Sequence, residues 1–204
     1  MTNYFDLGKK LNTDLLGKVL FEDKKLRLSK LVENKIFKSR FFLEKTISNS
    51  SQKIYGVNTG FGSLCDTQIP KKDINVLQEN LILSHACGTG EIVPKQIAKL
   101  MLLLKINSLC LGFSGVRVSL VKHLIKFYNK DLIPVIYEQG SLGASGDLAP
   151  LAHMSLPLLG KGEFYSKKGI TKSNKILKKE GLKLYKLSYK EGLALLNGTQ
   201  FMLS

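Results

Sequence analysis

Arginine is scarce in this strongly basic chain. The 204 residues include 31 lysines and arginines against 16 acidic residues, for a net charge of +15, yet the arginines are only Arg27, Arg40 and Arg117. Proteins that read base edges or make paired hydrogen bonds to phosphate favour arginine, because its planar guanidinium group presents a matching set of donors. The lysines are spread along the chain without an interleaved aromatic stripe. The composition therefore argues against a nucleic-acid partner.

Cysteine and histidine are also few, with three residues of each. Cys65, Cys87 and Cys110 form no Cys-x-x-Cys pair and are odd in number, which indicates free thiols in a reducing compartment. No two histidines have the spacing of metal ligands, and no carboxylate cluster lies near them. We therefore expect no bound metal and a cytoplasmic protein.

Long hydrophobic runs are absent. No uncharged segment is longer than the one between Asp147 and Lys161, which is too short and too interrupted by proline to span a bilayer. The start of the chain has no apolar stretch behind basic residues, so no signal peptide is expected. With hydrophobic residues at 44%, the composition is that of a globular protein with no membrane partner.

Apolar residues at helical spacing are the most frequent pattern in the sequence. A chain of 204 residues can bury a sizeable core, as one large domain or two small ones. Apolar residues at helical spacing, and a proline suited to a helix start, predict helices over residues 26–47, 71–86, from Pro94 onward, 116–128 and about 148–159. Glycine and asparagine predict a loop over 57–63, and 163–170 a small hairpin. The fold class is therefore mainly α.

A glycine-rich segment follows Gln139 and contains Ala144, Ser145 and Gly146. Glycine lets a backbone fold back and leaves its amide nitrogen uncrowded. Attack of the Gly146 nitrogen on the Ala144 carbonyl carbon would close a five-membered ring, and loss of water would turn the Ser145 side chain into a methylidene. Such an electrophile is supplied by no ordinary side chain. Two other interpretations stay open: an ordinary turn, and a serine nucleophile elbow, which requires glycine where this chain has Asp147.

Four short motifs cover residues 55–200 in a fixed order. They are Tyr55-Gly-Val-Asn-Thr-Gly-Phe-Gly62, Leu77-Gln-Glu-Asn-Leu81 followed by Ser84-His85-Ala86, Gln139-Gly-Ser-Leu-Gly-Ala-Ser-Gly-Asp-Leu-Ala-Pro150, and Glu191-Gly-Leu-Ala-Leu-Leu-Asn-Gly-Thr-Gln200. Together they resemble the successive signatures of the aromatic amino-acid ammonia-lyases. The resemblance implies a fumarase/aspartase-like helical fold, with residues 1–204 as its N-terminal region and 139–150 as its reactive loop.

The resemblance also implies the cofactor and the assembly. Ala144, Ser145 and Gly146 are expected to form 4-methylideneimidazole-5-one without added enzyme, metal or nucleotide. Members of the family are homotetramers whose sites draw on several chains. They are also longer than this chain, and the apolar stretch 193–203 ends without a polar cap. We therefore expect the front part of a longer protein, inactive alone and lacking the rest of the catalytic helical bundle.

Carried over by position, the resemblance makes Tyr55 the base that removes the β-proton of an amino-acid substrate. An unperturbed tyrosine has a pKa of about 10, and lowering it to about 8 requires roughly 2.7 kcal/mol of preferential stabilisation of the phenolate. One helix N-terminus gives about 0.3–1 kcal/mol, and up to about 2 when partly buried. Several helix ends or a cation are therefore expected at Tyr55. Gly60 and Gly62 are expected to let its loop close over substrate.

The substrate contacts follow from the same resemblance. Ser84 and His85 form a polar pair, where relatives acting on phenylalanine or tyrosine usually carry Phe-Leu or His-Leu. Polar partners suit an imidazole, whose two nitrogens need hydrogen bonds. This favours the branch of the family that converts L-histidine to urocanate and ammonia. Asn197 is expected near the cofactor and the substrate, and Asp147 is expected to support ring closure by accepting backbone hydrogen bonds.

Two alternatives come from different classes. The first is another enzyme with this cofactor, either a phenylalanine or tyrosine ammonia-lyase or an aminomutase. The second is a truncated helical fragment without activity, in which the Ala-Ser-Gly backbone stays unmodified. Of the remaining histidines, His123 is expected at the surface because lysines flank it, and His153 either in the core or as a support behind the residues that touch the substrate.

Overall fold

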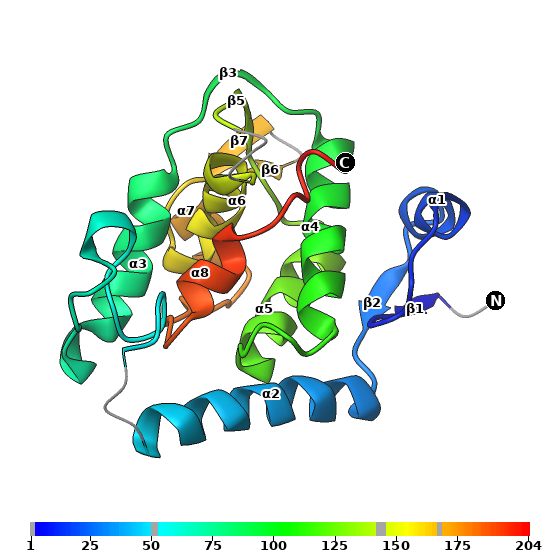
Figure 1. Cartoon of the computed structure of the whole chain (residues 1–204). Coiled ribbons are helices and arrows are strands. Elements are labelled where there is room, and N and C mark those ends of the chain that lie inside the picture. The colour runs from blue at the N-terminus through cyan, green and yellow to red at the C-terminus, as the bar shows by residue number, and fades with distance from the viewer. Residues whose placement is uncertain (1–2, 50–52, 142–145, 167–168) are drawn as a thin grey trace.

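The computed structural model describes residues 3–49, 53–141, 146–166 and 169–204, and most of their regular structure is helical (Figure 1). The α-helices are α1 (Thr13–Phe21), α2 (Lys30–Asn49), α3 (Ile74–His85), α4 (Lys95–Cys110), α5 (Val118–Asn129), α6 (Leu148–Ser155), α7 (Ser173–Lys179) and α8 (Glu191–Leu196). Short 3-10 helices are η1 (Gly62–Leu64), η2 (Lys71–Asp73) and η3 (Leu156–Leu159). The prediction of a mainly α fold is confirmed.

The strands are short and form small sheets. β1 (Tyr4–Asp6) pairs in parallel with β2 (Lys25–Arg27), and β3 (Thr89–Ile92) pairs antiparallel with β5 (Tyr137–Gln139). An antiparallel sheet has the order β4-β6-β7, with strands at Ile133–Pro134, Glu163–Ser166 and Gly169–Lys172. The hairpin predicted over 163–170 is confirmed as β6 and β7.

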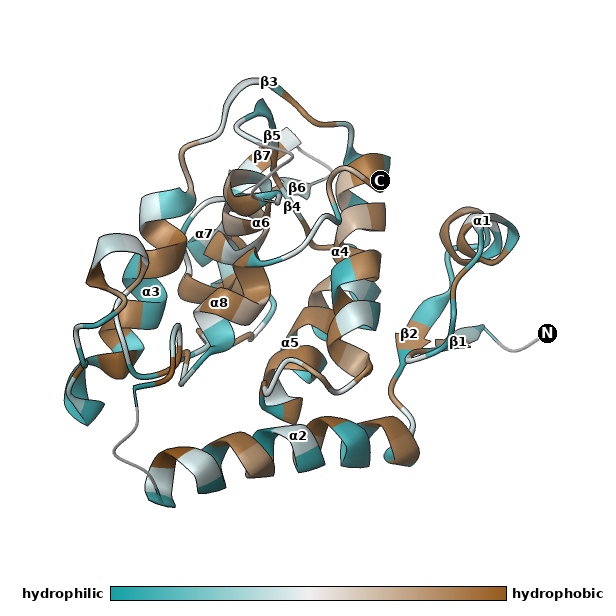
Figure 2. Cartoon of the chain, viewed as in Figure 1, coloured by the Kyte–Doolittle hydropathy of each residue, from teal (hydrophilic) through white to brown (hydrophobic). Residues whose placement is uncertain are grey.

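Two groups of helices share one core. α4 and α5 pack together, and α2 runs across one end of the pair (Figure 1). α3, α6 and α8 pack against one another in the second group. Buried apolar side chains connect the groups, including Met101, Leu124, Leu151 and Leu195, and Figure 2 shows hydrophobic residues along α4, α6 and α8. No helix in the described part of the chain is long and apolar enough to cross a membrane.

Local spacing predicted several helices well. η2 and α3 together cover the predicted segment 71–86, and α6 with η3 covers 148–159. α4 begins directly after Pro94, at a helix start where the missing N–H of proline costs no helical hydrogen bond. α5 begins two residues beyond the predicted 116. The predictions of these helices agree with the structure because the buried face of each helix is determined by apolar residues that lie close together in the sequence.

The predicted helix over 26–47 is wrong at its start. Leu26 lies in β2, where it is paired with Phe5, and α2 begins only at Lys30. The Asn129 side chain accepts a hydrogen bond from Leu26 N at 2.7 Å and donates one to Leu26 O at 2.9 Å. Asn129 satisfies both backbone groups from 103 residues away, so helical spacing near Leu26 could not reveal the strand.

One further expectation needs correction. His123 is half-buried and not freely exposed: its ring packs edge-on against Phe127 and Tyr185, with centroids 5.0 and 5.6 Å away. Burial lowers the His123 pKa. At the end of the chain, Phe201 packs against the core, whereas Met202 and Leu203 are exposed. Tyr185 is distant in sequence from His123, which explains why the flanking lysines misled the prediction.

Candidate active site

The ends of three packed helices carry predicted site residues. His85 is the last residue of α3, Asp147 directly precedes α6, and Asn197 directly follows α8. α3, α6 and α8 contact one another pairwise, as Figure 1 shows. The fold therefore brings residues from three distant motifs onto one helical group.

Asp147 is the best-connected of these residues. Its side chain is fully buried. Oδ2 accepts hydrogen bonds from the backbone nitrogens of Phe201 and Met202 at 2.7 and 3.0 Å, and Oδ1 accepts one from Ser141 Oγ at 2.7 Å. Its own nitrogen donates to Gly198 O at 2.9 Å. Asp147 thus links the segment after α8 to Ser141 and to the start of α6.

Gly146 lies beside the same segment and fits the expected cofactor. Its φ is +88°, a left-handed conformation that L side chains rarely adopt. A Cβ built there would lie 2.9 Å from Gly198 O, so only glycine suits the position. Ala144 and Ser145, the other ring-forming residues, lie outside the described residues. The backbone of Gly146 therefore lies directly against the segment that follows α8.

Lys105 is a member of this site that the sequence reasoning missed. It lies on α4 with 1% of its surface exposed, and its Nζ donates to Asn197 O at 2.8 Å. Burial lowers the Lys105 pKa to about 7, and the charge of Asp147 opposes that shift. One signal was available: Lys105 follows the buried Met101 by four residues, which places it on the apolar stripe of the helix.

The backbone and the side chain of Asn197 have different surroundings. Its backbone is fixed, because the nitrogen donates to Leu193 O at 2.9 Å and the oxygen accepts from Lys105. The residue as a whole is exposed. An amide side chain held this way can both donate and accept toward a ligand.

His85 is half-buried at the end of α3. Its Nδ1 lies 2.8 Å from Leu81 O and 3.2 Å from Ser84 Oγ. Since a carbonyl oxygen only accepts, the contact with Leu81 places the proton on Nδ1. In the neutral ring, Nε2 is then left as a hydrogen-bond acceptor for a ligand.

His153 ties the segment after His85 to α6. Its Nε2 accepts a hydrogen bond from Gly88 N at 3.0 Å, and its ring packs edge-on against Tyr137 with centroids 5.0 Å apart. Burial lowers the His153 pKa, which agrees with a neutral ring accepting at Nε2. This arrangement positions His153 as a support for the β3–β5 region and not as a ligand-facing group.

Tyr55 lies on a loop packed against α8. It is 56% exposed, and its ring contacts Phe61 edge-on with centroids 5.8 Å apart. A Cβ at Gly56 would lie 2.4 Å from Leu193 Cδ2, one turn before Asn197. Gly60 is closely packed, because its Cβ would lie 2.6 Å from Leu64 Cβ, whereas Gly62 has φ +57° and open space.

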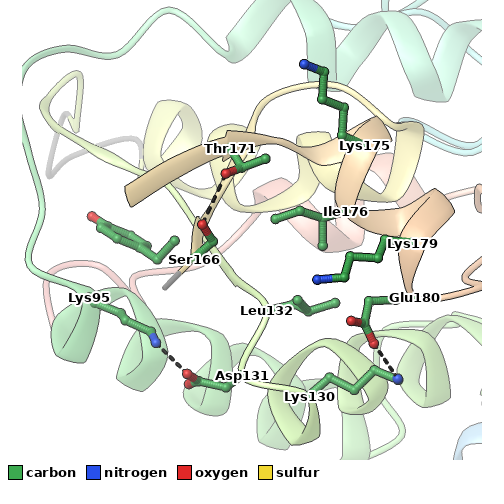
Figure 3. A pocket seen from close by; sticks show the side chains of 11 residues that line it. Lys95, Lys130, Asp131, Leu132, Ser166, Thr171, Lys175, Ile176, Lys179 and Glu180 are labelled. Atoms are coloured by element: carbon green, nitrogen blue, oxygen red, sulfur yellow. Dashed lines mark hydrogen bonds and ion pairs between the residues drawn. The ribbon is translucent and has the colours of Figure 1, made fainter. Parts of the chain in front are cut away.

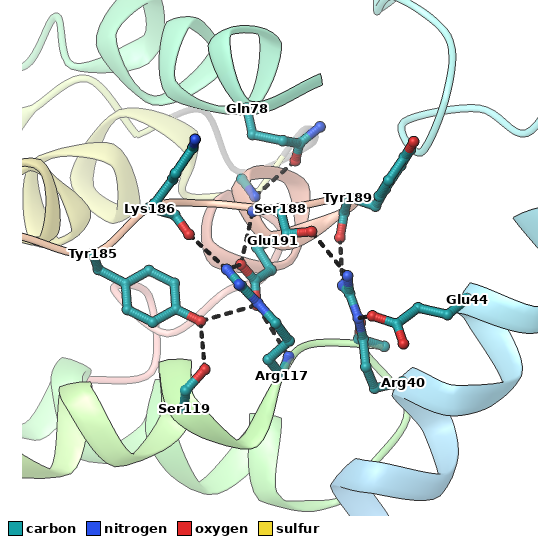
Figure 4. A network of polar contacts seen from close by, with 12 residues as sticks. Arg40, Glu44, Gln78, Arg117, Ser119, Tyr185, Lys186, Ser188, Tyr189 and Glu191 are labelled. Atoms are coloured by element: carbon teal, nitrogen blue, oxygen red, sulfur yellow. Dashed lines mark hydrogen bonds and ion pairs between the residues drawn. The ribbon is translucent and has the colours of Figure 1, made fainter. Parts of the chain in front are cut away.

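A buried polar network anchors the other end of α8 (Figure 4). Glu191 accepts hydrogen bonds from Arg117 Nε at 3.0 Å and Nη2 at 2.7 Å, and from Ser188 N at 2.9 Å. Arg40 donates to Ser188 Oγ at 2.9 Å and to Tyr189 O at 2.9 Å. These bonds connect the start of α8 to α2 and α5, and so fix the direction in which the helix delivers Asn197.

A cavity of about 670 Å³ lies elsewhere, between the end of α5, the β6–β7 hairpin and α7. Ion pairs join Lys95 to Asp131 and Lys130 to Glu180 along its wall (Figure 3). None of the predicted site residues lines it. Among the residues that the structure describes, no group of three histidine, cysteine or acidic side chains could hold a metal ion.

The fold and the site define a class of protein. The similar solved structures place the chain in the fumarase/aspartase-like class of helical folds, that of the aromatic amino acid lyases and aminomutases. The family model for aromatic amino acid lyases matches residues 11–204. The chain therefore belongs to the aromatic amino acid lyase family.

Similar proteins include lyases and aminomutases. Histidine ammonia-lyase of Bacillus subtilis (strain 168) is 47% identical over 195 residues, covering 96% of this chain and 38% of the relative. The structure of histidine ammonia-lyase from Trypanosoma cruzi has a TM-score of 0.87 at 36% identity, covering 98% of this chain and 38% of that one. A phenylalanine aminomutase of Pantoea agglomerans has a TM-score of 0.90 at 32% identity, with the same coverage. The chain spans about 38% of the length of these relatives.

Proposed function

We propose that this chain is the N-terminal part of a histidine ammonia-lyase, which eliminates ammonia from L-histidine to give urocanate, the first step of histidine degradation. The observation that carries the proposal is the 47% identity to the Bacillus subtilis enzyme over nearly the whole chain. The polar pair Ser84 and His85 supports the histidine branch, because both side chains hydrogen-bond and can serve an imidazole.

The rest of the enzyme is part of the proposal. Since the chain spans 38% of its relatives' length, the complete protein supplies further helices that complete the site, and the chain alone has no activity. The complete enzyme is a cytoplasmic homotetramer with sites shared between subunits. The exposed free thiols of Cys65 and Cys87 support a reducing compartment.

The cofactor is 4-methylideneimidazole-5-one, formed from Ala144, Ser145 and Gly146. Gly146 supports this assignment, because its conformation and its approach to Gly198 O admit no side chain. When formed, the group supplies an electron-poor carbon that accepts the substrate amine, which makes the nitrogen a better leaving group. Asp147 holds the neighbouring backbone through its hydrogen bonds to Phe201 and Met202.

The residues of this chain have separate tasks in the reaction. Tyr55 removes the proton from the β-carbon while the bond from the α-carbon to nitrogen breaks and a carbon–carbon double bond forms. His85 accepts a hydrogen bond at Nε2 from the imidazole of the substrate, since its Nδ1 is held by Leu81 O. The Asn197 amide binds the amino-acid end of the substrate. Gly62, with open space around it, lets the Tyr55 loop move over the bound ligand.

A second candidate function is an aminomutase or a lyase for phenylalanine or tyrosine. The observation that favours this second function is the similarity in fold to a phenylalanine aminomutase, with a TM-score of 0.90. It fits less well, because sequence identity is 32% there and 47% to the histidine enzyme. Substrate preference of the complete protein decides between them.

The test uses the complete protein that contains this chain. Intact mass should show a loss of about 36 Da, two waters, located to residues 139–150. Urocanate should form from histidine in preference to products of phenylalanine or tyrosine. Tyr55→Phe should lower kcat by about 100-fold or more, the range for a lost general base, without changing the mass loss. An unmodified backbone in active, assembled protein would remove the proposed cofactor and leave the inactive-fragment alternative.

The matched control is Tyr4→Phe. Tyr4 is 52% exposed and Tyr55 is 56% exposed, but Tyr4 lies in β1, where its ring is near Arg27. We expect wild-type turnover in this control. Equal turnover in Tyr55→Phe and Tyr4→Phe would exclude Tyr55 as the base.

A further inference from the structure

Lys105 is an unusual residue for an apolar helix. Its neighbours on α4 that are buried include Met101, Leu102, Ile106 and Leu109. Taking an ammonium group out of water is costly unless hydrogen bonds or an opposite charge compensate. A methionine or leucine at this position would fill the same core without that cost. The retention of a lysine therefore calls for a role that an apolar side chain cannot perform.

A short series of contacts leads from Lys105 to the ring-forming residues. Lys105 Nζ donates to Asn197 O at 2.8 Å, and the next carbonyl, Gly198 O, accepts from Asp147 N at 2.9 Å. The same Gly198 oxygen is the nearest atom to the position that a Gly146 side chain would occupy. Lys105 thus holds one peptide group, and the adjacent one contacts the backbone of the reactive loop.

The charge of Lys105 also faces Asp147. The Asp147 carboxylate raises the pKa of Lys105 against the effect of burial, so the two groups interact across the segment that follows α8. Asp147 Oδ2 is meanwhile occupied by the nitrogens of Phe201 and Met202. Lys105 and Asp147 therefore bind the same segment, residues 197–202: Lys105 at the carbonyl oxygen of Asn197, and Asp147 at the nitrogens of Phe201 and Met202.

Anchoring of α8 does not require Lys105. The helix is fixed at its start by Glu191, which binds Arg117, and by Gln78 Oε1, which accepts from Gly192 N at 2.8 Å. Residues inside α8 are also buried in the core, including Ala194, Leu195 and Leu196. What Lys105 adds is control of the first peptide group after the helix, which none of these contacts reaches.

We propose that Lys105 is a positioning residue for cofactor formation: through Asn197 and Gly198 it fixes the Gly146 backbone in the conformation that closes the ring. This inference rests on the proposed function, because it needs Ala144, Ser145 and Gly146 to cyclise. The Gly146 nitrogen attacks the Ala144 carbonyl carbon, and the ring then loses two waters. Lys105 forms no bond in these steps. It acts by holding the backbone that carries the attacking nitrogen.

The experiment follows ring closure over time in the complete protein made by cell-free synthesis. Intact mass gives the fraction of chains that have lost about 36 Da. In Lys105→Met, which keeps the length but cannot donate, ring closure should slow by about tenfold or more, the effect of losing one hydrogen bond from a charged group. In Lys105→Gln, whose amide is too short to reach Asn197 O, it should also slow.

The matched control is Lys99→Met on the same helix. The Lys99 side chain is 14% exposed and pairs with Asp23 at 2.7 Å, away from the reactive loop. Both methionine variants remove a largely buried ammonium from α4, but only Lys105→Met should slow the mass loss in soluble protein. A general loss of stability would slow the mass loss in both methionine variants, whereas a positioning role of Lys105 predicts slowing in Lys105→Met alone.

Each outcome decides the inference. Ring closure at the wild-type rate in Lys105→Met overturns it. If that variant is insoluble, a wild-type rate in soluble Lys105→Gln overturns it, and a slowed rate supports it. Equal slowing in Lys99→Met also overturns it, because the effect would then belong to α4 as a whole. Absence of the mass loss in the wild-type protein overturns both this inference and the proposed function, whereas a normal loss in all variants overturns this inference alone.

Discussion

The two ends of α8 hold buried charges in opposite ways. At the first end, Glu191 is fully buried and is bound directly by Arg117 Nη2 at 2.7 Å. At the second end, Lys105 is 1% exposed and donates to a neutral acceptor, Asn197 O, at 2.8 Å. No ion pair joins Lys105 to Asp147 among the salt bridges of the described residues. At the first end, the opposite charges of Glu191 and Arg117 are therefore in direct contact. At the second end, Lys105 and Asp147 form no ion pair.

The pKa values follow this difference. The hydrogen bonds that Arg117 donates to Glu191 raise the pKa of Arg117, so the folded state favours that charge. Burial lowers the pKa of Lys105 to about 7, so the folded state disfavours its charge. A paired network of this kind stabilises a fold, whereas a disfavoured charge is typical of functional sites. The comparison supports an anchoring role for the first end of α8, and it agrees with the positioning role that we propose for Lys105 at the second end.

The largest expected effect is at the anchoring end. Glu191→Ala leaves Arg117 and the nitrogen of Ser188 without their carboxylate partner, which should lower the free energy of unfolding by about 3 kcal/mol. The urea midpoint of the complete protein measures it. Glu44→Ala is the control, since Glu44 pairs with Arg40 but its side chain is 53% exposed, and it should cost less than about 1 kcal/mol. A similar loss in both variants would contradict the anchoring role.

Sequence alone predicted what depends on local spacing. The buried stripe of α4 and the proline before it gave that helix, and the apolar positions of 71–86 gave α3. Composition and turn residues gave the β6–β7 hairpin. The motif residues Asp147, His85 and Asn197 were selected by resemblance, and the packing of α3, α6 and α8 was not needed to select them. Periodicity and motif order carry this information because neither depends on distant partners.

What sequence could not predict depends on contacts between distant residues. β2 exists because Asn129 binds the backbone of Leu26. The role of Glu191 follows from Arg117, 74 residues earlier, and that of Lys105 from Asn197, 92 residues later. In their own segments, Asn129 and Glu191 look like ordinary surface residues. The spacing of Lys105 from Met101 places it on the apolar stripe of α4 but does not show which group it binds. Only the folded chain shows the partners of all three residues.

The pH dependence of stability tests the second end, with a smaller effect. Unfolded Lys105 has a pKa of 10.5 and folded Lys105 one of about 7, so between these values the unfolded state binds more protons and stability rises with pH. Below about pH 7 both states are protonated and the cost of the buried charge is complete. Relative to Lys105→Met, the wild-type protein should gain about 1–2 kcal/mol between pH 7 and 8.5.

Urea unfolding of both proteins at several pH values measures this gain. The difference between the two curves isolates Lys105 from the other lysines, which are common to both. A constant difference across the range would show that Lys105 keeps an ordinary pKa in the complete protein, and the contrast between the two ends of α8 would then be lost.

The smallest expected effect tests which contact anchors the first end of α8. Gln78 is fully buried, and its Oε1 accepts from Gly192 N at 2.8 Å and Leu193 N at 3.4 Å. Its Nε2 has no partner among the described atoms. Gln78→Leu loses hydrogen bonds to the first turn of α8 but also removes the unpaired Nε2. Because these contributions oppose each other, we expect the free energy of unfolding, measured from the urea midpoint, to fall by about 1 kcal/mol or less. A loss as large as that of Glu191→Ala would mean that the first turn is anchored by its amide partner and not by the ion pair.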